Sequence, residues 1–170
     1  MAEEVKVRLG KPEDVDRVLE LILFASKEMG IAPPSAAKIL SEIWPALNQH
    51  FGIMGLIEGP DGILEGGILL RIGALWYSDQ IVLEEKGIFV HPDYRSAKGG
   101  RAKKLCEFGK KTSDEMGLPL IMGIFSNERT SGKIRLYERL FGEPAGAMFL
   151  YNGKTGSWTD NKAEIGRAHV

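Results

Sequence analysis

Two hydrophobic periods alternate along the chain, one typical of strands and one typical of helices. Val5, Val7 and Leu9 alternate with charged residues, which predicts a strand with one buried face. The stretch behind Pro12 instead gathers its apolar side chains on one helical stripe. In chain order we predict strands at residues 5–9, 51–58, 63–72, 82–91, 118–126 and 145–151, and helices at residues 12–30, 35–47, 100–116 and 131–140.

Turn residues and apolar runs indicate how these elements connect. Residues 59–62, Gly-Pro-Asp-Gly, predict a tight turn that joins the second and third strands in a hairpin. Residues 118–126 are almost all apolar, which is typical of a strand buried on both faces of a sheet. Pro45 is expected to kink or shorten the second helix. The strand, helix and strand between 82 and 126 predict a right-handed βαβ unit, and therefore one α/β domain with a mixed sheet.

Composition adds limits to this picture. A chain of 170 residues, with 22 basic and 23 acidic side chains and 44% hydrophobic residues, is typical of one globular domain and excludes a disordered chain. Cys106 lies on the apolar stripe of its helix, so we predict a core residue and no disulfide. The acidic start and the short apolar runs exclude a signal peptide and a membrane span. We expect a cytoplasmic protein that binds no membrane, and the histidines show no metal-ligand spacing.

A basic cluster coincides with a glycine-containing loop before the third helix. Between Arg95 and Lys111 there are seven basic residues and one acidic residue. Gly99 and Gly100 allow backbone amides to point inward beside the positive end of the helix, which predicts an anion site. The alternative is a turn followed by a solvated lysine face. One loop and one helix face are too small a basic surface to indicate a nucleic-acid partner.

The loop and its surroundings resemble a known family. Residues 89–101, FVHPDYRSAKGGR, lie between a predicted strand and a predicted helix and resemble motif A of the GCN5-related N-acetyltransferases (GNAT). The order of elements over residues 5–151 is similar to that family. Asn127 and the run LYERLFG at residues 136–142 resemble its second motif. Residues 76–95 are especially similar to acetyltransferases encoded by bacteriophages.

The chain departs from the family pattern at two places. Lys98 occupies the first glycine position of the loop, and only Gly100 matches the second. The spacing from Asn127 to Tyr137 is longer than usual, and the order Phe-Gly at residues 141–142 inverts the common Gly-Phe.

The resemblance implies a single-domain GNAT fold, an α/β architecture with a mixed, mostly antiparallel sheet and flanking helices. The strands at 82–91 and 118–126 would form a parallel pair that splays apart, with acetyl-CoA as co-substrate in the gap and no metal. Main-chain groups of residues 88–90 would bind the pantetheine arm, and the loop would wrap the diphosphate. The implied cofactor-binding residues are Ile88, Phe89, Val90, Arg95, Ser96, Ala97, Lys98, Gly99, Gly100, Arg101 and Asn127.

The reaction implied is transfer of the acetyl group to a primary amine, on a small molecule or a peptide, by direct attack in a ternary complex. A lysine-like amine is mostly protonated at neutral pH, so a base is required. The resemblance implies Glu84 or Glu85 as the base and Tyr137 as the proton donor to the departing thiolate. Adjacent strand residues face opposite sides, so at least one glutamate has another role. For Tyr137 the alternative is core packing.

Two other classes of function stay open at this point. One is a CoA-binding or virion-associated module that keeps the fold without turnover, and the other is a structural protein without a cofactor. The acceptor amine carries no recognisable code in the sequence.

The end of the chain has an unusual sequence. Residues 164–170, EIGRAHV, back-translate to codons that contain the start of a short-read sequencing adapter. We predict a domain at 1–163, with its core at 5–151, and a non-native tail at 164–170. The family ends in a further strand beside residues 145–151, so the last hairpin is expected to be incomplete or completed by a partner chain in a homodimer.

Overall fold

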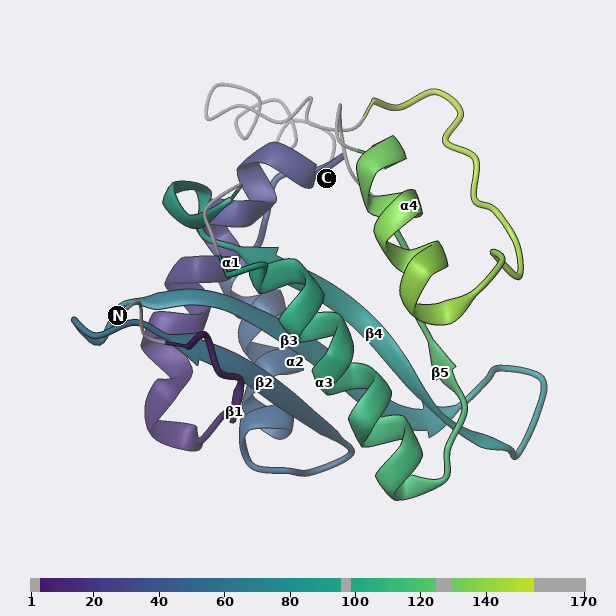
Figure 1. The fold of residues 1–170 in the computed structure, drawn as a ribbon, viewed down its shortest axis with the longest axis horizontal. Helices are drawn as coiled ribbons and strands as arrows, with labels where there is room; N and C mark the ends of the chain where they lie inside the picture. The colour runs from purple at the N-terminus through teal and green to yellow at the C-terminus, as the bar shows by residue number, and fades with distance from the viewer. Residues whose placement is uncertain (1–3, 96–98, 125–129, 155–170) are drawn as a thin grey trace.

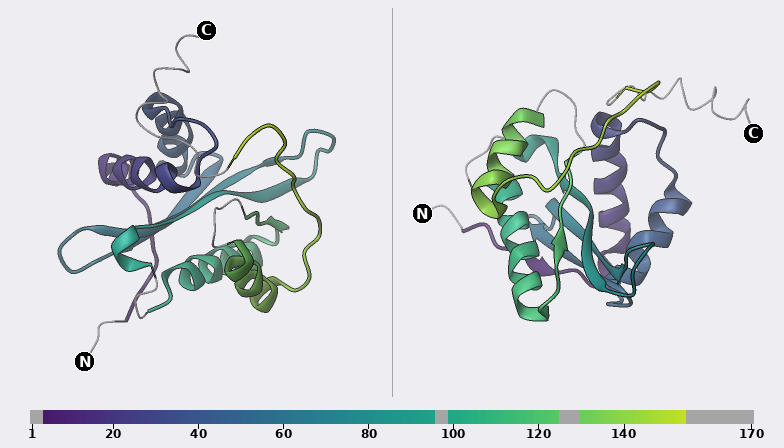
Figure 2. Two further views of the ribbon diagram at one scale, coloured as in Figure 1. Left: turned by 90° about the horizontal axis from the view of Figure 1, so that it is seen from above. Right: turned by 90° about the vertical axis from the view of Figure 1, so that its right-hand side faces the viewer.

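A twisted sheet lies between two layers of helices in the computed structural model, which describes residues 4–95, 99–124 and 130–154 (Figure 1). Helices α1 and α2 cover one face of the sheet, and α3 and α4 lie on the other, as Figure 2 shows. The strands are β1 (Arg8–Leu9), β2 (Gly52–Glu58), β3 (Leu64–Ala74), β4 (Ile81–Val90) and β5 (Leu120–Ile121). The helices are α1 (Val15–Met29), α2 (Ala36–Leu47), α3 (Arg101–Met116) and α4 (Thr130–Phe141), with short 3-10 turns at Pro12–Asp14 and Pro92–Tyr94.

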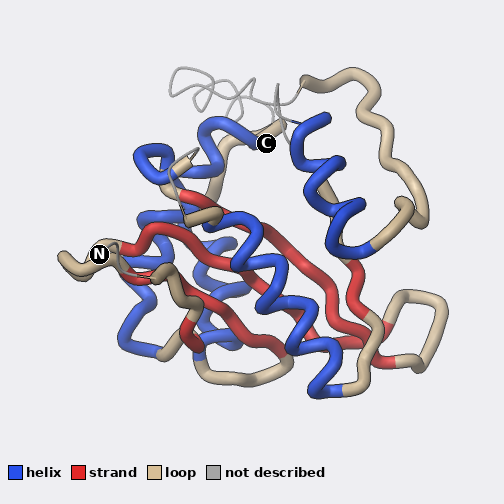
Figure 3. Tube along the Cα trace, viewed as in Figure 1, coloured by secondary structure: helices blue, strands red, loops and turns tan. Residues whose placement is uncertain are grey.

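The strands follow the order β1-β2-β3-β4-β5, antiparallel except for the parallel pair β4 and β5 (Figure 3). The predicted hairpin of β2 and β3 is confirmed, and the Gly59 N–H donates to the Ile63 carbonyl across its turn at 2.8 Å. Helix α3 connects β4 to β5, which confirms the βαβ unit. It ends at Gly117, whose φ of +65° costs a glycine little. The fold is therefore the predicted single-domain α/β architecture.

Two hydrophobic clusters fix the helical layers to the sheet. One cluster joins α1 and α2 to β2 and β3, with Leu21, Leu47 and Met54 at its centre. The other packs Leu105 of α3 against Ile68 of β3. Burial of this kind stabilises by roughly 25 cal/mol per Å² of apolar surface. Ile88 and Val90 of β4 pack against the second cluster, so α3 and β4 share one core where the candidate site begins.

The strand predicted at 118–126 is wrong in length and in burial. Within residues 118–124 only Leu120–Ile121 is a strand, and Ile121 is 40% exposed. Residues 125 and 126 lie outside the described part of the chain. In the described part of the chain β5 pairs with β4 alone, so one edge has no neighbouring strand to cover it. An apolar run indicates that its side chains are buried, but it does not determine whether they are buried between a sheet and a helix or against another element.

The strand predicted at 145–151 is also wrong, because these residues form no strand and are exposed. Phe149 is 94% exposed and Tyr151 is 90% exposed. The sequence of residues 145–151 had predicted a strand, but a strand needs an edge to pair with. The strand predicted at 5–9 is reduced to Arg8–Leu9, which pairs with β2. No helix in the described residues has the length and hydropathy needed to cross a bilayer.

A buried carboxylate joins the N-terminal strand to the first helix. Asp14 is 1% exposed and accepts hydrogen bonds from both terminal nitrogens of Arg8, at 2.8 and 2.9 Å, and from the Lys11 N–H at 2.8 Å. Arg17 adds a further hydrogen bond at 2.6 Å. The Arg8 guanidinium in particular lowers the pKa of Asp14 well below its usual range.

Replacing Asp14 with asparagine is expected to lower the free energy of unfolding by about 2 kcal/mol, because buried donors lose a charged acceptor. A depressed carboxyl pKa stabilises the fold in full above the unfolded-state value of about 3.9 and loses that effect gradually as the pH falls from there through the folded-state pKa. Urea titrations of wild type and Asp14→Asn should therefore differ at pH 7, still differ near pH 3, and converge only when the pH falls below the depressed pKa of Asp14. Asp16→Asn, at an exposed position in the first turn of α1, is the control. Equal stability of Asp14→Asn and wild type at pH 7 would contradict this role.

Candidate active site

Strand β4 contains the irregularity around which the candidate site is built. Leu69 of β3 faces Gly87, whereas the next residue, Leu70, faces Glu85, so Lys86 is an extra residue in β4. A β-bulge of this kind bends the strand and changes the direction of neighbouring side chains. It lies directly after the short stretch in which β4 pairs with β5.

The parallel pairing of β4 with β5 is limited to Leu83–Leu120 and Glu84–Ile121. Beyond these pairs, β4 continues to Val90 with β3 along one edge, and no described strand lies along the other. The outer edge of residues 85–90 is therefore open within the described part of the chain. This matches the splayed pair that the resemblance to the GNAT family implied.

The direction of the backbone amides along this open edge follows from the ladder with β3. The His91 N–H donates to the Glu65 carbonyl at 2.8 Å, so it faces β3. Because amides face alternate edges in successive residues of a strand, those of Ile88 and Val90 face outward and that of Phe89 faces β3. Of the three residues predicted to bind a pantetheine arm, Ile88 and Val90 thus have main-chain groups directed at the open edge. The Phe89 side chain lies in the core.

Glu85 occupies the point where the two strands part. The Gly123 N–H donates to its Oε2 at 3.4 Å, so the carboxylate bridges β4 and the chain that follows β5. Removal from water raises the pKa of Glu85 to about 7, and the Gly123 amide and the Lys133 cation offset this only in part. A carboxyl group with this pKa both accepts and releases a proton near neutral pH, as a general base must.

Helix α4 places Tyr137 near Glu85. Its hydroxyl is hydrogen-bonded to the Cys106 thiol of α3, and the charge of Glu85 acts on both groups. Burial raises the pKa of Tyr137 above its ordinary value and raises the pKa of Cys106 to about 12. Tyr137 therefore keeps its proton at neutral pH. Cys106 is fully buried, as the sequence predicted for a core residue.

Glu84 belongs to the other side of the sheet. Lys86 pairs with it at 2.8 Å, and the Arg71 Nη1 lies 3.9 Å away. The prediction that the two adjacent glutamates face opposite sides is thus confirmed. Between the two candidate bases, the geometry favours Glu85, because Glu84 is neutralised on the surface while Glu85 lies in the gap.

The glycine-containing loop leads into α3 at the far end of the open edge. Gly99 and Gly100 both have positive φ, +115° and +55°. A Cβ at Gly99 would lie 2.6 Å from Val5, whereas a Cβ at Gly100 would meet Lys103 alone, at 3.7 Å. Gly100 is the N-cap of α3, so the first-turn N–H groups and the positive dipole end of a 16-residue helix lie beside it. An anionic group fits this place.

Both arginines of the motif contact protein groups. The Arg95 Nε donates to the Val90 carbonyl at 3.1 Å. Arg101 pairs with the buried Glu65 of β3 at 3.0 Å, and its guanidinium lies 5.0 Å from the centre of the Tyr94 ring. These contacts hold the loop to β3 and β4. A direct contact of either guanidinium with a diphosphate stays a prediction.

Some predicted residues lie outside the described part of the chain. They are Ser96, Ala97, Lys98, Asn127 and the proposed tail at 164–170. In the residues that the structure does describe, no group of three or more histidine, cysteine, aspartate and glutamate side chains is arranged to hold a metal ion.

Sequence reasoning missed two groups of this site. Glu65 was not singled out, although a charged residue within an otherwise apolar strand requires a buried partner. The Gly123 amide carries no signal in the sequence, because a backbone group becomes a ligand only when the chain is folded.

Comparisons with known proteins agree with the fold. No protein-family model and no curated protein sequence matches the chain. Among solved structures, it is similar to the aminoglycoside N-acetyltransferase AAC(6')-Iy in complex with CoA, with a TM-score of 0.66, 17% identity, and 89% of this chain and 96% of that chain covered. It is also similar to a Trypanosoma brucei acetyltransferase, with a TM-score of 0.61, 20% identity, and 88% and 99% covered. A ribosomal-protein-alanine N-acetyltransferase from Brucella melitensis biovar Abortus gives a TM-score of 0.63, 17% identity, and 87% and 98% covered.

The chain has the GNAT acetyltransferase fold, because its mixed five-stranded sheet, its parallel β4–β5 pair and its flanking helices match these structures over most of both chains.

Proposed function

We propose that the protein is an N-acetyltransferase that uses acetyl-CoA and transfers the acetyl group directly to a primary amine. The observation that carries the proposal is the open edge of β4 with Glu85 at the point where β5 diverges. Structures of the same fold include enzymes that bear the names of aminoglycoside and protein N-acetyltransferases, and one of them holds CoA. These names support acyl transfer to an amine.

The residues along the open edge of β4 and at the start of α3 fit an acyl-CoA. The amides of Ile88 and Val90 would pair with the pantetheine arm as a neighbouring strand would. Gly100 and the first turn of α3 would hold the diphosphate. When bound, acetyl-CoA supplies an activated acyl group as a thioester. An outward N–H of residues 88–90 would stabilise negative charge on the acyl oxygen.

Two proton movements complete the reaction, and the chain has a residue for each. Glu85 would accept the proton of the acceptor amine, directly or through water, because its pKa lies near neutrality. Tyr137 would donate a proton to the sulfur that leaves, because its phenol stays protonated in its half-buried position. Both groups are close enough for the charge of Glu85 to affect Tyr137.

Acetyl-CoA is expected to raise the melting temperature by about 5 to 10 °C at 100 times its dissociation constant, which corresponds to about 2.7 kcal/mol. In Gly100→Ala a methyl group would enter the space that we assign to the diphosphate. A ten-fold weaker Kd would remove about half of that stabilisation. Thermal unfolding with and without acetyl-CoA measures the effect.

Gly117→Ala is the matched control, since Gly117 caps the other end of α3 with a similar φ of +65° and open space around it. Both variants carry a similar backbone strain of about 1 kcal/mol, so they should melt at similar temperatures without ligand. A shift that Gly100→Ala retains in full would contradict the assignment of the loop. The absence of a shift in the wild type would contradict the function.

A further inference from the structure

Helix α4 carries Tyr137 but belongs to neither hydrophobic cluster of the described residues. The two clusters that fix α1, α2 and α3 to the sheet include no side chain of α4 in the described part of the chain. Ile134 and Phe141 of α4 are each 37% exposed. The main neighbour of α4 is α3, which lies on the same face of the sheet, as Figures 1 and 2 show. The position of Tyr137 therefore depends on how α4 is attached to α3.

Polar contacts join α3 to α4 at two positions about one helical turn apart, within the residues that the structure describes. The Tyr137 hydroxyl is hydrogen-bonded to the Cys106 thiol. Further along α3, the Lys110 Nζ donates a hydrogen bond to the Leu140 carbonyl at 3.1 Å. Residues at i and i+4 lie on the same face of a helix, so Cys106 and Lys110 both face α4. On α4, Tyr137 and Leu140 at i and i+3 share a face in the same way.

The Lys110 contact lies at the end of α4, where a cation stabilises a helix. The last carbonyls of a helix have no partner within it, and α4 ends at Phe141, directly after Leu140. The negative end of the helix dipole adds to the attraction of the ammonium group. Tyr137 lies about 4.5 Å along the helix axis from Leu140, so the contact acts within one turn of the phenol.

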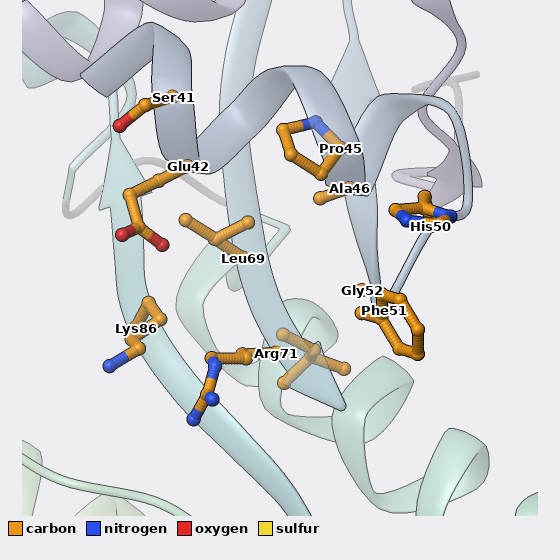
Figure 4. Close-up of a pocket in the computed structure, with 11 residues that line it drawn as sticks. Ser41, Glu42, Pro45, Ala46, His50, Phe51, Gly52, Leu69, Arg71 and Lys86 are labelled. Atoms are coloured by element: carbon orange, nitrogen blue, oxygen red, sulfur yellow. The ribbon is translucent and has the colours of Figure 1, made fainter. Parts of the chain in front are cut away.

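The depression on the opposite face of the sheet does not support α4. It has a volume of about 230 Å³ and lies between α2, β3 and β4, where Figure 4 shows Glu42, Arg71 and Lys86. No described residue of α4 lines it. Strand β4 separates the depression from Tyr137, so the contacts with α3 are the ones that bear on the position of the phenol.

Granting the acyl transfer proposed above, we infer that Lys110 is a positioning residue, which holds the end of α4 so that the Tyr137 hydroxyl reaches the leaving sulfur. The Cys106 contact orients the phenol, and the Lys110 contact sets the position of the helix that carries it. A misplacement of about 1 Å can lower a rate about 100-fold, so a small shift of α4 is expected to lower kcat. Lys110 is exposed, so its substitution leaves both hydrophobic clusters intact.

Lys110→Met removes the ammonium group and keeps a long aliphatic side chain. With neamine, cadaverine or L-lysine as the amine, kcat for thiol release from acetyl-CoA should fall about ten-fold. KM for acetyl-CoA should change by less than about two-fold, because Lys110 lies about 15 Å along α3 from Gly100. Lys110→Arg should retain kcat, since a guanidinium can donate to the same carbonyl. Lys111→Met is the matched control and should also retain kcat, because Lys111 is 75% exposed and lies 3.8 Å from Glu115.

A double variant distinguishes positioning of the hydroxyl from a role in stability alone. In Tyr137→Phe the hydroxyl is already absent, so the addition of Lys110→Met should change kcat by less than about two-fold. A role in stability alone would give the same loss with and without the hydroxyl, and that result would overturn the inference. An unchanged kcat in Lys110→Met, or an equal loss in Lys111→Met, would overturn it as well.

Amide hydrogen exchange without acetyl-CoA tests the Lys110 contact independently of turnover. In Lys110→Met the amides of residues 138–141 should exchange at least about three-fold faster, because the end of α4 opens more often, and the amide of Leu105 in α3 should not change. Exchange in α4 equal to that of a wild type that releases thiol would overturn the inference and leave the acetyltransferase standing. Faster exchange in α4, together with no thiol release by the wild type with any of the three amines, would contradict the acetyltransferase and leave Lys110 as the residue that fixes the end of α4.

Discussion

Glu85→Gln is expected to lower kcat by about 100- to 1,000-fold, the usual contribution of a general base. An amide cannot accept the proton of the amine, and the hydrogen bond from the Gly123 N–H to the side chain can remain. The wild-type profile of kcat/KM against pH should rise through an apparent pKa of about 7, since the base acts when it is ionised. That limb should disappear in the variant. Steady-state rates of thiol release between pH 5.5 and 9 measure both effects.

Glu84→Gln is the matched control for this prediction, because it removes the adjacent carboxylate on the other side of the same strand. It should retain kcat and the rise near pH 7. Loss of stability does not explain the expected result for Glu85→Gln, because burial disfavours the charged carboxylate and the neutral amide avoids that penalty. Equal losses of kcat in Glu85→Gln and Glu84→Gln would contradict the assignment of Glu85 as the base.

Tyr137→Phe is expected to lower kcat by about 100-fold and to leave KM for acetyl-CoA unchanged. The phenyl ring keeps its contact with Phe141, and the variant loses only the hydroxyl and its hydrogen bond to Cys106. That hydrogen bond contributes about 1 kcal/mol to stability. Rates with saturating amine and a thermal melt of the same sample separate the catalytic loss from the structural one.

Tyr77→Phe removes a hydroxyl from a 69% exposed tyrosine and should change neither kcat nor stability. An unchanged kcat in Tyr137→Phe would show that the hydroxyl serves the packing of α4 against α3. The leaving thiolate would then take its proton from solvent.

Residues with strong local preferences correctly predicted the turns and the helix ends of the fold. The turn at residues 59–62 determines the β2–β3 hairpin, and the glycine at 117 ends α3 in a left-handed conformation that other residues avoid. The N-cap at Ser35 accepts a hydrogen bond from the Lys38 N–H, as its side chain predicts. The glycine pair at 99 and 100 indicated the loop before α3.

The errors arose where structure depends on distant partners. In the described part of the chain, the apolar run at 118–126 contributes only the two-residue β5, which pairs with β4, and residues 145–151 have no strand beside them. The partnership of Tyr137 with Cys106 requires α3 and α4 to pack together, which neither helix reveals alone.

Amide hydrogen exchange read by NMR, with and without saturating acetyl-CoA, tests the central claim most directly. The account predicts that the amides of Ile88 and Val90 exchange at least about ten-fold more slowly with the ligand, because they gain hydrogen-bond partners at the open edge. Phe89, whose amide already faces β3, should change little. Exchange at Ile88 and Val90 that is the same with and without acetyl-CoA would contradict the account, because the edge of β4 would then not be the binding site.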